Sequence, residues 1–312
     1  MKVFITGIAG FIGFHTAQHY LGEGWEVTGC DNFNDYYDQK LKHDRADVLK
    51  KLDIKVYHTD VNKIQLAMSL FEPVPDLVIH LAASAGIRHS LANPIESIGN
   101  NIIATQVLIN HCETLGVENV IYASTSAVMN GNDLPWNETD KCGVQVSPYG
   151  YTKLANESQF DVSTINNVVG LRFFTVYGPW GRPDMALFSF TDNIINNKPI
   201  TVFNDGDMQR DFTYIDDIVN GIWLVSQNMT KRDIYCIGNG TQVNLMDFIH
   251  EIERNVGNGK ATYDFQPMHP ADAKETWADT TKIETLGYKS STNVPEGVRD
   301  FVNWYKEYYN ES

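Results

Sequence analysis

The sequence predicts an α/β fold, with a doubly wound parallel sheet of the Rossmann type and a smaller second α/β lobe. Two observations predict it. Six short apolar runs alternate with helix-length segments up to about residue 174, and a glycine-rich turn follows the first of these runs. Because parallel neighbours need crossover connections, this alternation is typical of a sheet covered on both faces by helices. A chain of 312 residues, 43% of them hydrophobic, can bury a large core.

The elements follow in the order that such a fold requires. The expected strands are 3–6, 26–30, 55–58, 77–81, 120–123 and 168–173. The later segments are less regular, namely a Gly- and Pro-rich stretch at 178–183, a helix near 185–196, a strand at 200–203 and a turn at 205–207. The last helix has one apolar face, formed by Val298, Phe301, Val302 and Tyr305. We therefore predict one domain over 1–174, to which a segment near 208–238 returns, and a second lobe over 175–312.

Composition and charge exclude several classes of protein. The net charge of −15 and the absence of Lys- and Arg-rich runs make nucleic acid a poor partner. No stretch approaches the roughly 18 apolar residues of a membrane span, and the strand at 3–6 leaves no room for a signal peptide, so we expect a cytoplasmic protein. The four cysteines contain no Cys-x-x-Cys pair, which indicates neither a disulfide framework nor a metal site.

The first strand runs directly into a Gly-x-x-Gly-x-x-Gly turn that opens a helix. Gly7, Gly10 and Gly13 let the backbone approach a pyrophosphate, whose charge the amides and the helix N-terminus hold. Asp31 follows the second strand, where a carboxylate binds the ribose hydroxyls and repels a 2′-phosphate. These features predict NAD, and not NADP, as the cofactor. Further cofactor contacts are expected at the ends of the third and fourth strands, from Asp60, Val61, Leu81, Ala82 and Ala83.

A second set of residues predicts proton and hydride chemistry on an alcohol. Tyr149 and Lys153 lie one helical turn apart, after the strand whose end carries Thr125. The same spacing occurs in Tyr36 and Lys40, but that pair does not follow a strand end with hydroxyl groups. A nearby ammonium and a cationic nicotinamide would both lower the pKa of a tyrosine from its usual value of about 10. We therefore predict Tyr149 as the general base, Lys153 as its charge partner and Thr125 as a hydrogen-bond donor to the substrate oxygen.

These motifs resemble those of extended short-chain dehydrogenases/reductases that act on nucleotide sugars, over essentially the whole chain. The resemblance is closest to UDP-glucuronate 4-epimerases. It rests on the segments Asp31-Asn32-Phe33-Asn34-Asp35-Tyr36-Tyr37, His80-Leu81-Ala82-Ala83, Ala85-Gly86-Ile87-Arg88 and Arg172-Phe173-Phe174-Thr175-Val176-Tyr177-Gly178-Pro179-Trp180-Gly181-Arg182-Pro183-Asp184-Met185-Ala186.

The resemblance implies a reversible oxidation at C4 of a UDP-sugar, with a 4-keto intermediate that turns over before it is reduced again. It also implies a homodimer through the helix that begins near Tyr149 and the helix near 94–115. Besides the residues above, it implies that Phe11, Ile12, Asn32 and Asn101 contact NAD. The substrate contacts that it implies or makes plausible are Arg88, Ser126, Thr175, Arg182, Arg210 and Asp272. An Arg side chain suits a diphosphate because it donates two parallel hydrogen bonds, although Arg210 could instead form a surface ion pair with Asp211 or Asp216.

Other outcomes share the first half of this reaction. Dehydratases of the family carry Asp-Glu directly after the catalytic Thr, and UDP-glucuronate decarboxylases carry Glu two residues after it. Here these positions are Ser126 and Ala127, which favours epimerisation. UDP-glucose or UDP-N-acetylglucosamine remain alternative substrates, and an NAD-binding regulatory protein is the non-enzymatic alternative. A silent active site would be expected to lose Tyr149 or Lys153, and both are present.

Overall fold

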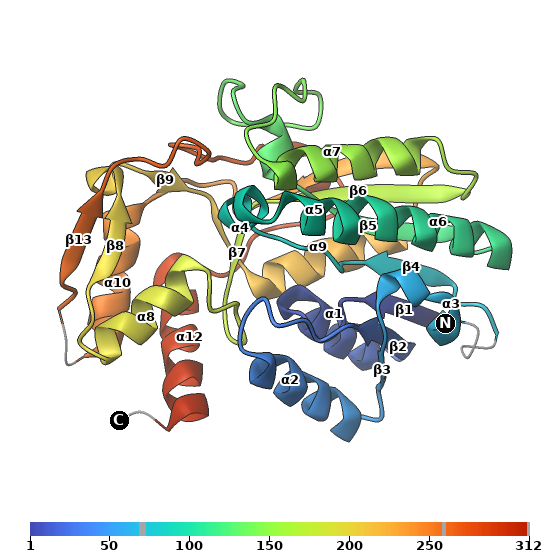
Figure 1. Ribbon diagram of the computed structural model, residues 1–312, viewed down its shortest axis with the longest axis horizontal. Helices are drawn as coiled ribbons and strands as arrows, with labels where there is room; N and C mark the ends of the chain where they lie inside the picture. The colour runs from blue at the N-terminus through green and yellow to red at the C-terminus, as the bar shows by residue number, and fades with distance from the viewer. Residues whose placement is uncertain (69–72, 258–259, 311–312) are drawn as a thin grey trace.

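Seven parallel strands form the central sheet of the computed structural model, which describes residues 1–68, 73–257 and 260–310 (Figure 1). The strand order is β11-β6-β5-β4-β1-β2-β3. The predicted fold class is confirmed, and six strands lie where the sequence places them. The seventh strand comes from the later part of the chain and pairs with β6. The bounds are β1 Lys2–Thr6, β2 Glu26–Asp31, β3 Lys55–His58, β4 Leu77–His80, β5 Asn119–Thr125, β6 Asn167–Phe173 and β11 Arg232–Ile237.

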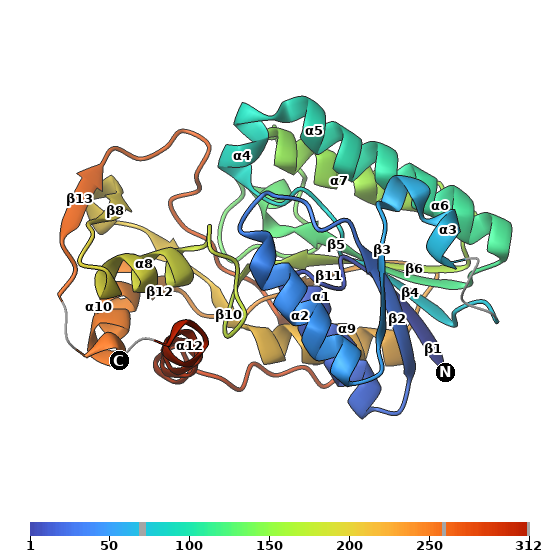
Figure 2. The ribbon, with the colours of Figure 1, turned by 60° about the horizontal axis from the view of Figure 1, so that its bottom comes forward.

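Helices cover both faces of the sheet, as Figure 2 shows. One face carries α1 Phe11–Gly22, α2 Gln39–Lys51 and α9 Ile215–Gln227. The other face and its edge carry α3 Gln65–Met68, α4 Ile87–Ala92, α5 Pro94–Ile98, α6 Ala104–Leu115 and α7 Pro148–Asp161. A π-helical segment, Gly99–Ile103, joins α5 to α6. In the described part of the chain, no helix is both long enough and apolar enough to cross a membrane.

The second lobe lies beside the carboxyl ends of the strands (Figures 1 and 2). Its helices are α8 Ala186–Ile195, α10 Leu245–Val256 and α12 Val294–Tyr309, whereas α11 Thr281–Glu284 packs against β11 of the central sheet. Three further two-stranded sheets lie outside the central sheet, made of β7 Thr175–Tyr177 with β10 Phe212–Tyr214, β9 Gln209–Arg210 with β12 Val243–Asn244, and β8 Ile200–Phe203 with β13 Tyr263–Gln266.

The strand order places a crevice at the centre of the sheet. From β1 the chain proceeds through β2 to β3 on one side, and then returns to β4, which pairs with β1 on its other side. At such a switch point the connections leave in opposite directions, so a ligand can enter between them at the carboxyl ends of the strands. Thr6 pairs with both Cys30 and His80, so three strands end at the same level there.

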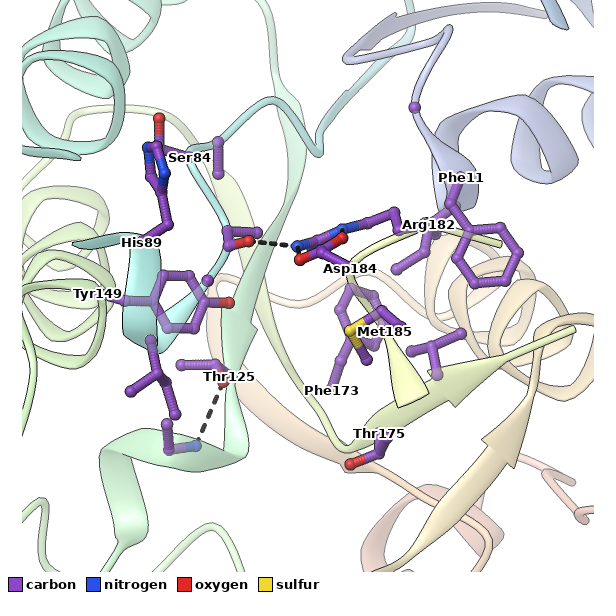
Figure 3. A pocket seen from close by; sticks show the side chains of 18 of the residues that line it. Phe11, Ser84, His89, Thr125, Tyr149, Phe173, Thr175, Arg182, Asp184 and Met185 are labelled. Carbon is purple, nitrogen blue, oxygen red and sulfur yellow. Dashed lines mark hydrogen bonds and ion pairs between the residues drawn. The ribbon is translucent and has the colours of Figure 1, made fainter. Parts of the chain in front are cut away.

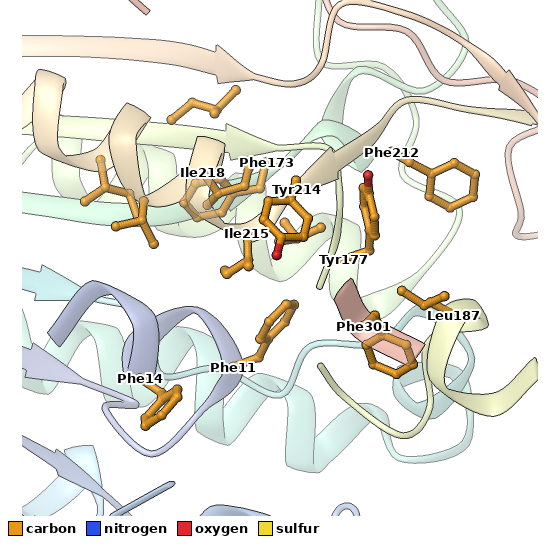
Figure 4. Packing of buried hydrophobic residues seen from close by; sticks show 14 of the residues in the cluster. Phe11, Phe14, Phe173, Tyr177, Leu187, Phe212, Tyr214, Ile215, Ile218 and Phe301 are labelled. Carbon is orange, nitrogen blue, oxygen red and sulfur yellow. The ribbon is translucent and has the colours of Figure 1, made fainter. Parts of the chain in front are cut away.

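One continuous apolar cluster connects the two lobes (Figure 4). It includes Phe11 and Phe14 of α1 as well as Phe301 of α12, and the Phe212 and Phe248 rings stack within it at a centroid distance of 3.9 Å. The four apolar residues predicted on the last helix are all buried. Because the lobes share this core, the second lobe is held firmly over the crevice.

Candidate active site

The glycine-rich turn between β1 and α1 is shaped for close approach of a ligand. Gly7 has a φ of +70°, and a Cβ atom there would lie 2.9 Å from the Ala82 nitrogen. A Cβ atom at Gly13 would lie only 2.2 Å from the Gly7 oxygen. Gly10, the N-cap of α1, gives the helix no side-chain cap. The first amides of α1 are therefore free to bind an anion, and the turn fits the pyrophosphate of a dinucleotide.

Acidic side chains lie beside this turn, at the ends of β2 and β3. The Asp31 carboxylate is 8% exposed and accepts a hydrogen bond from the Phe33 amide at 2.9 Å. Burial raises the pKa of Asp31, while the charge of Lys42 opposes the shift. The Asn32 side chain donates to Asp60 at 2.9 Å, so these two residues hold each other in place. Each carboxylate oxygen has two lone pairs, which leaves Asp31 able to accept from ribose hydroxyls.

The three predicted catalytic side chains come from β5 and α7 and line one cavity, and Figure 3 shows Thr125 beside Tyr149. Thr125 ends β5, and Ser147 caps α7 by accepting a hydrogen bond from the Gly150 amide at 3.1 Å. The Tyr149 ring lies beside Thr125 in the cavity (Figure 3). Lys153 is buried and donates from Nζ to the carbonyl of Ala123 at 2.9 Å. A hydroxyl, a phenol and an amine thus share one wall of the crevice.

Burial is the main influence on the pKa of Tyr149 in this structure. Burial raises it above its usual value, and the nearby Thr125 hydroxyl and the charge of Arg182 only partly oppose this shift. Burial also lowers the pKa of Lys153 to about 8, so the amine is still mostly charged at neutral pH. The lowering that we expect from the ammonium together with a cationic nicotinamide stays a prediction for the NAD-bound protein.

A single cavity of about 880 Å³ extends from the glycine-rich turn to the second lobe. Among the described residues, its lining includes five Lys or Arg side chains and four Asp side chains, in a protein whose net charge is −15. The predicted site residues that line it are Gly7, Gly10, Phe11, Ile12, Gly13, Asp31, Asn32, Asp60, Val61, Leu81, Ala82, Ala83, Arg88, Thr125, Ser126, Tyr149, Lys153, Thr175, Arg182, Arg210 and Asp272.

Asn101 is the one predicted site residue that the structure does not bring to the cavity wall. It is 1% exposed, and its side chain bonds to both backbone groups of Ser84, at 2.8 and 3.1 Å. Its amide nitrogen also donates to the Thr152 hydroxyl on α7 at 2.9 Å. Asn101 thus ties the loop after β4, which lines the cavity, to the helix that carries Tyr149 and Lys153.

Two predicted substrate residues pair with each other across the cavity. Arg88 of α4 donates to the Asp272 carboxylate of the second lobe at 2.7 Å, and its guanidinium lies 4.0 Å from the centre of the Phe203 ring. Arg88 is half-exposed, so this ion pair is partly screened by water. Nothing in the sequence pattern pairs them, because they are far apart in the chain.

Arg210 makes a different set of contacts. Its guanidinium donates to the carbonyls of Gln209, Ala273 and Lys274, at 2.6 to 2.9 Å. Burial lowers its pKa, and the charge of Asp272 opposes that shift. No ion pair with Asp211 is found in the described part of the chain. A partly desolvated cation held by neutral carbonyls suits a phosphate ligand.

Sequence reasoning missed a network opposite Tyr149 (Figure 3). Arg182 forms an ion pair with Asp184, and the Tyr36 hydroxyl donates to the same carboxylate at 2.8 Å. Tyr36 and Asp184 both lie within the motifs quoted above, which is the only signal that could have identified them. Lys40 points elsewhere, to Asp44 on the exposed side of α2, so the Tyr36 and Lys40 spacing forms no catalytic pair.

Comparisons with known proteins agree with this geometry. The sequence model of the NAD dependent epimerase/dehydratase family matches residues 3–238. The UDP-glucuronate 4-epimerase of Thermodesulfobacterium geofontis is 40% identical, over 97% of this chain and 95% of that protein. UDP-glucuronate 4-epimerase 4 of Arabidopsis thaliana is 37% identical, over 99% of this chain and 76% of that protein. The crystal structure of UDP-glucuronic acid 4-epimerase from Bacillus cereus, with UDP-glucuronic acid and NAD, has a TM-score of 0.91 at 33% identity and covers 99% of this chain and 100% of that one.

Proposed function

We propose, from the premise that the chain belongs to the NAD dependent epimerase/dehydratase family, that it interconverts UDP-glucuronate and UDP-galacturonate at C4. The observation that carries the proposal is the single cavity, which Thr125, Tyr149 and Lys153 line together with Arg88, Arg182 and Arg210. Relatives named UDP-glucuronate 4-epimerase, matched over most of both chains, support the choice of sugar.

The roles of the side chains follow from their positions. The Gly7–Gly13 turn and Asp31 would hold NAD, which when bound accepts a hydride and returns it. Tyr149 would take the proton from the O4 hydroxyl, and Thr125 would hold that oxygen through its own hydroxyl. Lys153 would supply positive charge that favours the tyrosinate, once substrate and cofactor fill the cavity. Arg210 would hold the diphosphate, so that the oxidised sugar can turn over without leaving.

The cavity wall favours epimerisation over decarboxylation. Ala127 lies next to Ser126 in the turn after β5, and its amide donates to the Thr125 hydroxyl at 3.2 Å. No acidic side chain therefore stands two residues after Thr125 to reorient the uronate. The hydroxyls of Ser126 and Thr175 line the same cavity and can hold the carboxylate near the sugar ring plane. In that plane the breaking C–C bond overlaps poorly with the C4 ketone.

We expect UDP-galacturonate to be the main product from UDP-glucuronate, with only traces of UDP-xylose or UDP-4-keto-pentose. The test incubates the purified protein with UDP-glucuronate, UDP-glucose or UDP-N-acetylglucosamine, without added NAD, and identifies products by NMR. Release of CO₂ in most turnovers would establish a decarboxylase instead. A clear preference for UDP-glucose would also contradict the proposal, because that sugar lacks the carboxylate.

We also expect the protein to retain NAD through purification and NADP not to replace it. Asp31 is nearly buried and would lie against a 2′-phosphate, so repulsion should disfavour NADP by more than about tenfold. Denaturation and analysis of the released nucleotide measure this preference, and Asp31→Ala should reduce it. Asp47→Ala, on the exposed side of α2, is the matched control. Mainly NADP(H) in the wild-type protein would refute the assignment of Asp31.

The assembly and domain division are further parts of the proposal. Exposed apolar side chains on adjacent helices support a homodimer, since Ile95 is 79%, Ile103 55% and Tyr151 38% exposed.

We propose 1–174 with 208–238 as the NAD-binding domain and the rest of 175–312 as the nucleotide-sugar lobe, which the pairing of β11 with β6 supports. We place the reaction in the cytoplasm, in keeping with four free cysteines.

A further inference from the structure

The largest fully buried side chain in the described residues is a cation, Arg45 of α2. It is 0% exposed, and in the described part of the chain its hydrogen bonds go to three carbonyls and one hydroxyl, with no carboxylate among them. Its Nε has no hydrogen-bond partner there. The charge of Asp31 acts on Arg45 without a direct hydrogen bond. Burying a charge that no carboxylate bonds directly costs free energy, so such a residue is expected to do more than fill space.

The partners of Arg45 come from two functional segments. One guanidinium nitrogen donates to the carbonyl of Ala9, inside the glycine-rich turn, at 3.0 Å. The other donates to the carbonyls of Trp180 and Gly181. His15 of α1 lies on the same side, and its Nε2 is 3.0 Å from the Pro179 carbonyl. His15 and Arg45 of the NAD-binding domain therefore bind three successive carbonyls of the segment 178–185, those of Pro179, Trp180 and Gly181.

The held segment has an unfavourable backbone conformation and carries an active-site side chain. Trp180 has a φ of +60°, which is uncommon for a residue with a Cβ. Its ring packs against those of Phe14, Trp304 and Tyr308, at centroid distances of 5.1 to 5.3 Å. Two residues later, Arg182 enters the cavity and forms its ion pair with Asp184. Release of the clamped carbonyls would let this strained turn relax and move Arg182.

We propose that Arg45 is a positioning residue, which fixes the segment 178–185 on the glycine-rich turn and thereby places Arg182 in the substrate cavity. The role of Arg182 in binding the substrate rests on the proposed function, whereas the mechanical link through Arg45 does not. A guanidinium suits this link because its planar donors reach carbonyls in several directions at once. The ammonium of a lysine is a compact charge, and it cannot reach the carbonyls of Ala9, Trp180 and Gly181 at once.

The test replaces Arg45 with Met in the NAD-bound protein. Hydrogen exchange of the peptide covering 176–188 should accelerate about tenfold or more, while the amides of β4 and β5 stay protected. The KM for UDP-glucuronate should rise about tenfold, and kcat should change less than about threefold. The reason is that Arg182 loses its position, whereas the side chains proposed for the chemical step are unchanged. A purely structural defect would lower the active fraction, and so kcat, without raising KM. Arg45→Lys should give intermediate values of both.

Arg232→Met is the matched control. The Arg232 guanidinium also donates to main-chain carbonyls, such as that of Ile165 at 2.8 Å, but it lies at the far end of the sheet. This variant should leave KM and the exchange of 176–188 unchanged. Equal exchange in wild type and Arg45→Met, or an increase spread evenly over the sheet, would overturn the proposal. If Arg45→Met does not fold, Arg45→Lys decides by the same two readouts. If the wild type does not bind UDP-glucuronate, the proposed function fails and hydrogen exchange alone still decides the role of Arg45.

Discussion

Replacing Tyr149 with Phe is expected to lower kcat about a thousandfold and to leave the fold and the NAD content unchanged. The change removes one oxygen, which we propose as the proton acceptor, and general acid–base catalysis typically contributes 10²- to about 10⁴-fold. The backbone contacts of Tyr149 survive, since its amide donates to the Ser90 hydroxyl at 3.0 Å and its carbonyl accepts from the Thr152 hydroxyl at 2.9 Å. The measurement is kcat with UDP-glucuronate, together with the nucleotide released on denaturation.

Tyr151→Phe is the control for this prediction. Tyr151 lies on the same helix but is 38% exposed and does not line the cavity. Its replacement should change kcat by less than about twofold, because the change removes only a hydroxyl that lies outside the cavity and keeps the ring for the proposed dimer contact. If Tyr149→Phe kept more than about a tenth of the wild-type kcat, the loss would be under roughly 1.4 kcal/mol and Tyr149 would not be the base.

Much of the fold could be predicted because its signals are local. The apolar runs that became β1 to β6 are short, bounded and separated by helix-length segments, which suffices for a parallel sheet. The strand β11 was harder to predict. Its residues, Arg232–Ile237, lie in the segment near 208–238 that we predict to return to the first domain, but none of the predicted strands falls there. Its pairing with β6 places it in the large sheet. Pairing between distant segments leaves no periodic pattern in the sequence.

In the candidate site, too, local patterns predict some features, and contacts between distant segments could not be predicted. The sequence brings Tyr149, Lys153 and Thr125 together, because strand ends and following helices meet at one edge of a parallel sheet. The ion pair of Arg88 with Asp272 depends on how the second lobe docks, which no local pattern encodes. The pKa of Tyr149 also could not be predicted from the sequence, since the pKa of a buried tyrosine depends on how much water its surroundings exclude. Burial of Tyr149 outweighs its favourable neighbours in this structure.

Replacing Gly13 with Ala should abolish NAD retention and lower stability by about 2–3 kcal/mol. The new Cβ would lie 2.2 Å from the Gly7 oxygen, and both atoms belong to the backbone frame, so no side chain can move to relieve the contact. The first turn of α1 must shift away from the glycine-rich turn, which spreads the amides that we propose to hold the pyrophosphate. The NAD content per protein chain and the denaturant midpoint measure the two effects.

Gly22→Ala, in the last turn of the same helix, separates this local clash from a general effect of glycine replacement. A Cβ at Gly22 would meet no atom within 4 Å, and the residue is exposed. Because Ala favours helix by about 1 kcal/mol over Gly, this variant should keep its NAD and be as stable as the wild type or slightly more so. Full NAD content in Gly13→Ala would show that the turn tolerates the displacement, and the cradle proposed for the pyrophosphate would have to lie elsewhere. Loss of NAD from both variants would instead point to the helix as a whole, since only Gly13 touches the turn.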